Sequence, residues 1–184
     1  NVDSHKVNSN SIPSALKALN QWVCWRYKDR DGNGKLTKPP IDPRTLKLAK
    51  TNDPATWAPF SIAIDAYTLA DPAAGLQGVG FCFAEGDRLT GIDLDHVIDP
   101  NTGELNQEAA EILERFKGTY WEKSPSGTGL HGYCCHLGTL ELPKNKIRLA
   151  PSSVQDGSGK PPALEVYEEG RYFTVTGHHW AGSA

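Results

Sequence analysis

The sequence contains no methionine, and no two of its four cysteines show the C-x-x-C spacing of a structural zinc site. No apolar run approaches the roughly 20 residues that a membrane-spanning helix needs, and no signal peptide opens the chain. We therefore expect neither a membrane protein nor a zinc-stapled fold, and the cysteines favour a reducing compartment. Because the first residue is not methionine, we interpret the chain as an excised or processed piece of a longer protein.

The sequence also lacks a strong net charge, which is -3 at pH 7 and argues against a protein that holds duplex DNA by bulk charge alone. Its basic residues are concentrated between positions 26 and 50. Two interpretations stay open for this segment, a surface that meets phosphates or a solvated hairpin face. The segment holds eight basic and three acidic residues: Arg26, Lys28, Arg30, Lys35, Lys38, Arg44, Lys47 and Lys50 against Asp29, Asp31 and Asp42.

Hydrophobic residues make up 38% of the 184 residues, enough for a packed core in one sizeable domain or two small ones. The order of hairpins and separated helices predicts an α+β fold with mixed or antiparallel sheets. We expect residues 163–167 and 171–176 to pair with each other. The periodicity and turn residues predict helices over 11–19, 59–69 and 106–116, and strands over 21–27, 36–41, 78–84, 89–96, 119–123, 130–136, 163–167 and 171–176.

Two motifs in the chain imitate known binding loops. Residues 127–132 form a literal GxGxxG, but a dinucleotide site needs a helix to begin there, and residues 130–136 have the composition of a strand. Residues 29–34 imitate the start of a calcium-binding EF-hand loop, yet its twelfth position is Pro40 instead of a bidentate Glu. We reject the first interpretation and prefer a hairpin turn for the second.

Asp93 and Asp95 lie two residues apart in a predicted apolar strand and should therefore point to the same face of a sheet. Two like charges this close are costly unless a cation lies between them, and carboxylate oxygens are the ligands that magnesium and manganese prefer. A strand end with two exposed acids is the alternative for this pair alone.

Ser126, Gly127, Thr128 and Gly129 form a loop of small residues that leads to His131. Backbone N–H groups of such a loop can approach an anion closely, the hydroxyls can donate hydrogen bonds, and the imidazole can contact a phosphate oxygen. An ordinary β-turn is the alternative interpretation.

Glu165 alternates with apolar neighbours in a later strand, and Arg171 follows it. Glu165 could be a third metal ligand and Arg171 could meet a triphosphate, whereas a plain hairpin with Glu165 paired to a surface cation is the alternative. Taken together, an acid pair, a small-residue loop ending in His and a further strand acid would suit a two-metal nucleotidyl-transfer site.

At these residues the sequence resembles the archaeo-eukaryotic primase superfamily, in the branch of bifunctional primase-polymerases of phages, plasmids and mobile elements. The hhhDhD strand of that branch is matched by residues 90–95 (TGIDLD), where Thr90 and Gly91 depart from the apolar pattern. Its SxxGxH-like segment is matched by residues 126–131 (SGTGLH), and its strand acid by Glu165. Stretches around Trp22–Pro40 and Thr51–Trp57 also look like this branch, so the resemblance covers roughly residues 15–177.

The resemblance implies an amino-terminal α/β unit over about residues 11–76, packed on an RRM-like catalytic unit over about 77–180, after a frayed segment 1–10. The active site would lie in the cleft between the units. Metal ions, Mg²⁺ or Mn²⁺, would be held by Asp93, Asp95 and Glu165. Nucleotide phosphates would be bound by His131 and residues 126–129, with Lys38 and Arg171 assigned from charge and position.

The resemblance also implies template-directed synthesis of primers or DNA from nucleoside triphosphates on a single-stranded template. A helicase domain or protein would act in the full-length context, in the cytoplasm of a prokaryotic cell or phage-infected host. Two alternatives stay open: a metal-dependent nuclease that uses the same acids, and a non-catalytic module that binds single-stranded nucleic acid.

Overall fold

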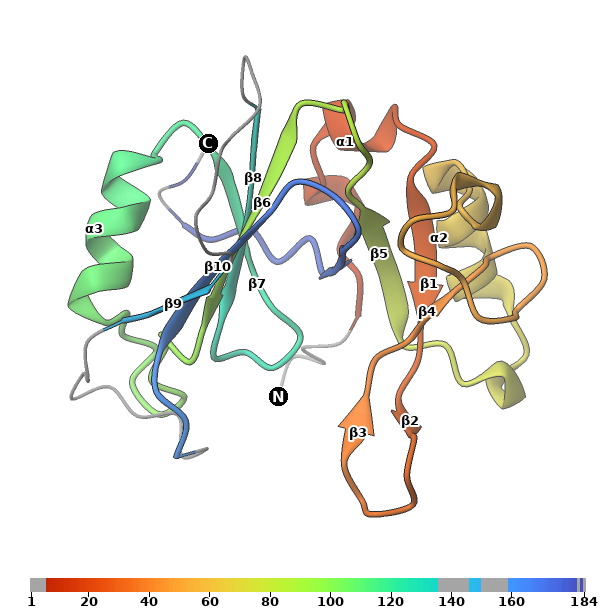
Figure 1. Ribbon diagram of the computed structural model, residues 1–184, viewed down its shortest axis with the longest axis horizontal. Helices are drawn as coiled ribbons and strands as arrows, with labels where there is room; N and C mark the ends of the chain where they lie inside the picture. Colours follow the sequence, from red (N-terminus) through yellow and green to blue (C-terminus); the bar gives the residue numbers. More distant parts are fainter. Residues whose placement is uncertain (1–5, 136–145, 150–158, 182, 184) are drawn as a thin grey trace. The chain divides into compact units, whose positions relative to one another are not determined.

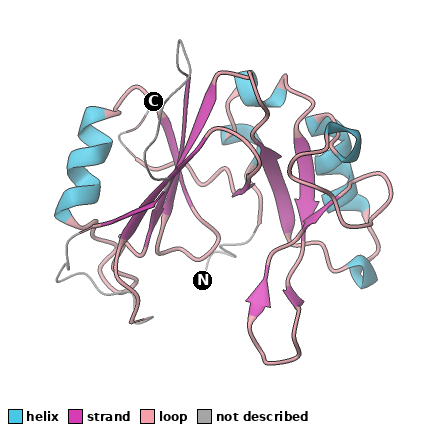
Figure 2. Ribbon diagram, in the orientation of Figure 1, coloured by secondary structure: helices cyan, strands magenta, loops and turns pink. Residues whose placement is uncertain are grey.

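The computed structural model describes residues 6–135, 146–149, 159–181 and 183. The chain divides into two compact units, each considered by itself below. Unit 1 comprises Asn1–Ala84 and Glu169–Gly177, and unit 2 comprises Glu85–Glu168 and His178–Ala184. Within these residues all strand pairs are antiparallel and the helices are few, which confirms the predicted α+β class (Figures 1 and 2).

Unit 1 is built on a four-stranded sheet of order β11-β5-β1-β4. Its strands are β1 (Trp22–Trp25), β4 (Pro40–Ile41), β5 (Gly78–Cys82) and β11 (Tyr172–Val175). Helix α2 (Phe60–Leu69) packs against β1 and β5, with the rings of Phe60 and Trp22 4.7 Å apart. All four residues of β1 are buried, so this strand lies in the centre of the core of unit 1.

The predicted first helix is much shorter than expected. Only Ser14–Lys17 forms α1, preceded by a 3-10 turn at Ser9–Ser11. Pro13 lies at the N-cap of this helix. Because proline has no backbone N–H to donate, it is disfavoured inside a helix, and the helix begins after it. Residues 1–5 of the expected frayed segment lie outside the described residues, whereas Asn8 donates a backbone hydrogen bond to Thr176.

A separate two-stranded hairpin carries much of the basic segment. Strands β2 (Lys28–Asp29) and β3 (Leu36–Thr37) pair with each other, and the chain then continues into β4, which pairs with β1. The predicted return strand 36–41 is thus split between two sheets. In the turn, Asp29 accepts a hydrogen bond from the Gly34 amide, as expected of a hairpin turn.

Unit 2 is built on a five-stranded sheet of order β7-β8-β6-β10-β9 (Figure 1). Helix α3 (Gln107–Arg115) follows β6, and Asn106 caps it by accepting the Ala109 amide. Ile92, Leu94, Trp121 and Leu130 form the core with α3 residues on one face of the sheet. The strands are β6 (Leu89–Asp95), β7 (Tyr120–Lys123), β8 (Leu130–Cys135), β9 (Lys146–Arg148) and β10 (Ala163–Tyr167).

The expected pairing of 163–167 with 171–176 is wrong. Strand β10 pairs with β6 and β9 in unit 2, whereas β11 pairs with β5 in unit 1. Residues 78–82 and 172–175, which we expected in the second unit, therefore belong to the sheet of unit 1. Each strand pairs where its buried face meets an apolar neighbour, which sequence proximity alone does not determine.

The strand predicted over residues 130–136 is confirmed, because strand β8, and not a helix, begins at Leu130. The predicted end of this strand at His136 lies outside the described residues. All four cysteines are free thiols. No helix in the described parts of the chain is long and apolar enough to cross a membrane.

Candidate active site

Strand β6 separates its apolar and acidic residues onto two faces. Ile92 and Leu94 are 4% and 0% exposed and pack on the α3 side, whereas Asp93 and Asp95 alternate with them and are half-buried on the other face. The strand ends at Asp95, and His96 adopts a left-handed backbone conformation with φ 57°. The two carboxylates thus lie on one face at the end of a central strand.

The register of the sheet places Asp93 in a row of ionisable side chains. Glu165 on β10 lies directly opposite Asp93 on one side, and His131 on β8 lies opposite it on the other. Glu122 on β7 in turn lies opposite His131. The structure therefore brings together Asp93, Glu165 and His131, which are far apart in sequence, and adds Glu122 to them.

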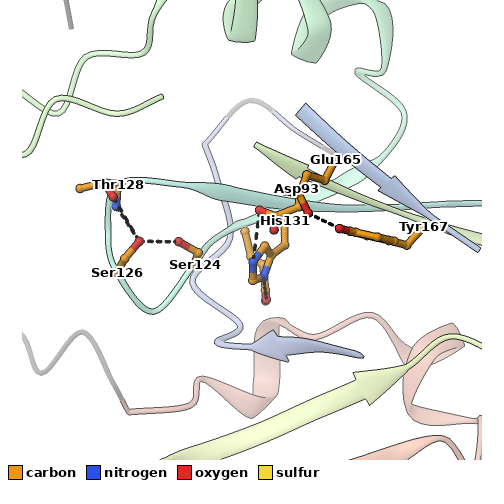
Figure 3. A network of polar contacts seen from close by, with 8 residues as sticks. Asp93, Ser124, Ser126, Thr128, His131, Glu165 and Tyr167 are labelled. Carbon is orange, nitrogen blue, oxygen red and sulfur yellow. Dashed lines mark hydrogen bonds and ion pairs between the residues drawn. The ribbon is translucent and has the colours of Figure 1, made fainter. Parts of the chain in front are cut away.

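His131 lies between two carboxylates, as Figure 3 shows for its Asp93 side. Its Nε2 atom is 3.7 Å from Asp93 Oδ1, and its Nδ1 atom is 3.9 Å from Glu122 Oε1. The side chain of Asp93 is 19% exposed, whereas that of Glu122 is 0% exposed. One side of the imidazole thus faces a reachable carboxylate and the other a fully buried one.

Glu122 was missed in the sequence, although strand 119–123 was predicted. Its signal lies in the alternation Tyr120-x-Glu122, which puts both side chains on the face that carries His131. An acid that follows two aromatic residues in a predicted strand next to the loop would have identified it as a candidate.

Three buried tyrosines lie in the row of the sheet next to the row that contains Asp93 and His131. Tyr133 pairs with Tyr120 and Gly91, and Gly91 pairs with Tyr167 on its other side. Burial, followed by the charge of Glu122 and a hydrogen bond to it, raises the pKa of Tyr120. The pKa of Tyr133 is raised by burial first and then by Glu122, with smaller contributions from Tyr120 and Asp93. The hydroxyls of Tyr120 and Tyr133 therefore stay protonated, and that of Tyr120 donates a hydrogen bond to Glu122.

The loop between β7 and β8 is held by its own hydroxyls. Ser126 Oγ lies 2.9 Å from Ser124 Oγ and 3.2 Å from Thr128 Oγ1 (Figure 3). Gly127 donates its amide to Ser124 O at 2.9 Å. The Thr128 carbonyl accepts the amides of Val97 and Ile98 at 2.9 and 3.0 Å. The loop is thereby fastened to the segment that follows Asp95.

The donor chemistry around Asp93 suits a hard divalent cation. Asp93, Asp95 and Glu165 offer carboxylate oxygens from one face of the sheet, and all three are partly exposed. Tyr167 donates a hydrogen bond to Glu165, which directs that carboxylate along its own strand (Figure 3). In the part of the chain that the structure describes, no three acid, histidine or cysteine side chains already converge as a metal site. The metal role of the three acids stays a prediction.

Lys38 and Arg171 both belong to unit 1, and neither is part of the row around Asp93. The Lys38 ammonium lies over the Trp25 ring, 5.6 Å from its centroid, and its carbonyl accepts a hydrogen bond from Tyr172. Arg171 is exposed, and its carbonyl accepts the Phe83 amide at 3.0 Å. Their contact with a triphosphate stays a prediction.

Comparison with known proteins adds a relative to this geometry. No protein-family model matches the chain. The chain is 39% identical over 174 residues to a protein of Nitratiruptor phage NrS-1 named DNA Primase-polymerase. The match covers 91% of this chain but 21% of that protein, so the chain spans about a fifth of its relative. The resemblance to primase-polymerases is confirmed by this homology.

Proposed function

Since this chain is homologous to one segment of a phage primase-polymerase, we propose that it is a catalytic domain of that type, a nucleotidyltransferase that makes primers or DNA on a template. The observation that carries the proposal is the register that places Glu165 and His131 on either side of Asp93. Strand order supports an RRM-like unit 2, because β8 lies between β6 and β7, α3 connects those two strands, and β10 flanks β6.

We propose Asp93, Asp95 and Glu165 as the ligands of two Mg²⁺ or Mn²⁺ ions. Such ions lower the pKa of an attacking 3′-hydroxyl and stabilise the leaving pyrophosphate. The contribution of the chain is to hold the carboxylates on adjacent, hydrogen-bonded strands, where they need little reorganisation. A nuclease would use the same acids but would have no use for the loop that leads to His131.

Residues 126–129 and His131 are proposed to bind the triphosphate of the incoming nucleotide. The Ser126 and Thr128 hydroxyls already contact each other, so they can turn together towards an anion without losing buried partners. His131 Nε2 lies on the Asp93 side, so a phosphate held there would be next to the acids. The loop and the acids thus form one continuous site within unit 2.

The proposed substrates and partners follow from that chemistry. They are nucleoside triphosphates, a single-stranded DNA template and a primer, with a helicase domain or protein supplying template in the full-length context. The exposed β2–β3 hairpin with Lys28, Arg30 and Lys35 is the part of the basic segment best placed to meet template phosphates.

One assay distinguishes the candidate functions. The domain is incubated with a single-stranded template, with or without primer, labelled nucleotides, and magnesium or manganese. We expect extension or new primers with the wild-type chain and their loss in Asp93→Ala plus Asp95→Ala. Asp65→Ala, an exposed acid on α2, serves as the matched control and should retain activity.

Each other outcome has a definite meaning. Shortening of the template in place of extension would support the nuclease. Binding of template without any product would support the non-catalytic module. Extension that survives in the Asp93→Ala plus Asp95→Ala protein, with the same metal dependence, would show that the catalytic site lies elsewhere.

A further inference from the structure

Glu122 is a fully buried carboxylate that the proposed nucleotidyl transfer does not use directly. Its side chain is 0% exposed, and Tyr120 donates a hydrogen bond to its Oε2 atom at 3.0 Å. After burial, the charge of Glu122 is the largest cause of the raised pKa of Tyr133. A buried acid is costly unless it is hydrogen-bonded, so its retention beside His131 calls for a physical reason.

Tyr120 fixes the orientation of the Glu122 carboxylate. It precedes Glu122 by two residues on β7, so the two side chains share one face of the sheet, and its hydroxyl donates to Glu122 Oε2. Because Oε2 accepts from Tyr120, Oε1 is the oxygen that faces His131 Nδ1, at 3.9 Å. The carboxylate therefore presents a lone pair to one defined nitrogen of the imidazole.

We propose that Glu122 is a positioning residue for His131, and this rests on the proposed function. Attraction between the imidazole and the buried carboxylate holds the ring with Nδ1 on the Glu122 side and Nε2 on the Asp93 side. The distance of 3.9 Å is longer than a hydrogen bond, and we expect it to shorten when a nucleotide binds. Tyr120 acts through Glu122 by keeping its carboxylate from rotating.

The arrangement has a simple consequence for nucleotide binding. A histidine that binds phosphate through Nε2 needs its ring held edge-on to the site, and a second carboxylate behind the ring supplies that restraint. Without Glu122, the ring can rotate about its side-chain bonds, and fewer rings present Nε2–H to the phosphate. The effect should appear in triphosphate affinity and not in template affinity.

A double-mutant cycle tests this role. Binding of a fluorescent nucleoside triphosphate and of single-stranded DNA is measured for the wild type, Glu122→Gln, His131→Ala and the double variant. We expect Glu122→Gln to weaken triphosphate binding about tenfold when His131 is present. In the His131→Ala background it should have almost no further effect. Glu111→Gln, an exposed acid on α3, is the matched control and should bind like the wild type.

A second variant keeps the test decisive if Glu122→Gln does not fold. Tyr120→Phe removes one hydrogen bond to Glu122 but leaves its charge, so we expect weaker triphosphate binding by about threefold, again only when His131 is present. Equal losses in both backgrounds would mean that Glu122 merely supports the fold, and an unchanged affinity would also overturn the proposal. Absence of triphosphate binding by the folded wild type would instead refute the proposed function itself.

Discussion

Gly129 lies where the loop of residues 126–129 packs closely against strand β6. We expect a single added methyl group at this position to push the loop away from the strand. A Cβ atom at this residue would lie 2.8 Å from Leu94 O, 3.0 Å from Ser124 Oγ and 3.7 Å from the Asp95 Cα atom. The Ser124 side chain can rotate away, but Leu94 O belongs to a central strand paired on both sides and cannot. The loop must therefore move away from Asp95.

Gly129→Ala should destabilise the protein by about 1–3 kcal/mol, the usual cost of overpacking a filled interior. Because the loop moves relative to the acids, triphosphate affinity should fall by roughly tenfold or more. Urea unfolding followed by tryptophan fluorescence and titration with a fluorescent nucleotide would measure the two effects.

Gly127 provides the matched comparison within the same loop. Its φ is +77°, and no atom lies within 4 Å of the position that a Cβ would take. Glycine is therefore favoured here by the backbone conformation and not by a lack of space. Gly127→Ala should cost about 1–2 kcal/mol through left-handed strain, and Gly127→Asn should recover part of that, since Asn tolerates this conformation. Gly129→Asn should instead be no better than Gly129→Ala. Wild-type stability and affinity in Gly129→Ala would refute the close packing of loop and strand.

Two further predictions concern pH and salt. Burial raises the pKa of Cys82 to about 12, and burial together with Asp42 does so for Cys24. In the unfolded chain these thiols lose their protons at a lower pH than in the folded protein. Each buried thiol therefore contributes stability that is lost above about pH 9, by roughly 1.4 kcal/mol per pH unit. Urea unfolding at pH 8, 9 and 10 should show this decline, and a Cys24→Ala plus Cys82→Ala protein with the same slope would contradict it. Lys28→Glu plus Arg30→Glu should weaken template binding and reduce its salt dependence, by about 0.7 in log–log slope per lost phosphate contact, without affecting triphosphate affinity; unchanged binding would favour a solvated hairpin face.

Local signals in the sequence were sufficient for the elements that carry the site. The alternation around Asp93 predicted β6, and Asn106 with its apolar repeat predicted α3 almost to the residue. Long-range pairing was the harder part. Glu165 was expected in a hairpin with the following strand, yet β10 lies beside β6, which is what brings Glu165 opposite Asp93.

Glu122 shows why part of the site escaped prediction. No motif marks it, and its burial depends on Tyr120, Tyr133 and His131, of which two lie on a different strand. Local alternation gives the face of a side chain but does not say which strand lies next to it.

The division of the chain has a consequence for the order in which the protein folds during synthesis. Strand β11, which completes the sheet of unit 1 beside β5, is made only after all of residues 85–168 of unit 2. Until then, β5 has an unpaired edge in the part of unit 1 already made, and exposed edges invite pairing with other chains. Emergence of Tyr172–Val175 from the ribosome would therefore be the step that closes unit 1, so a chain ending at residue 168 should be prone to aggregation even though every strand of unit 2 is present.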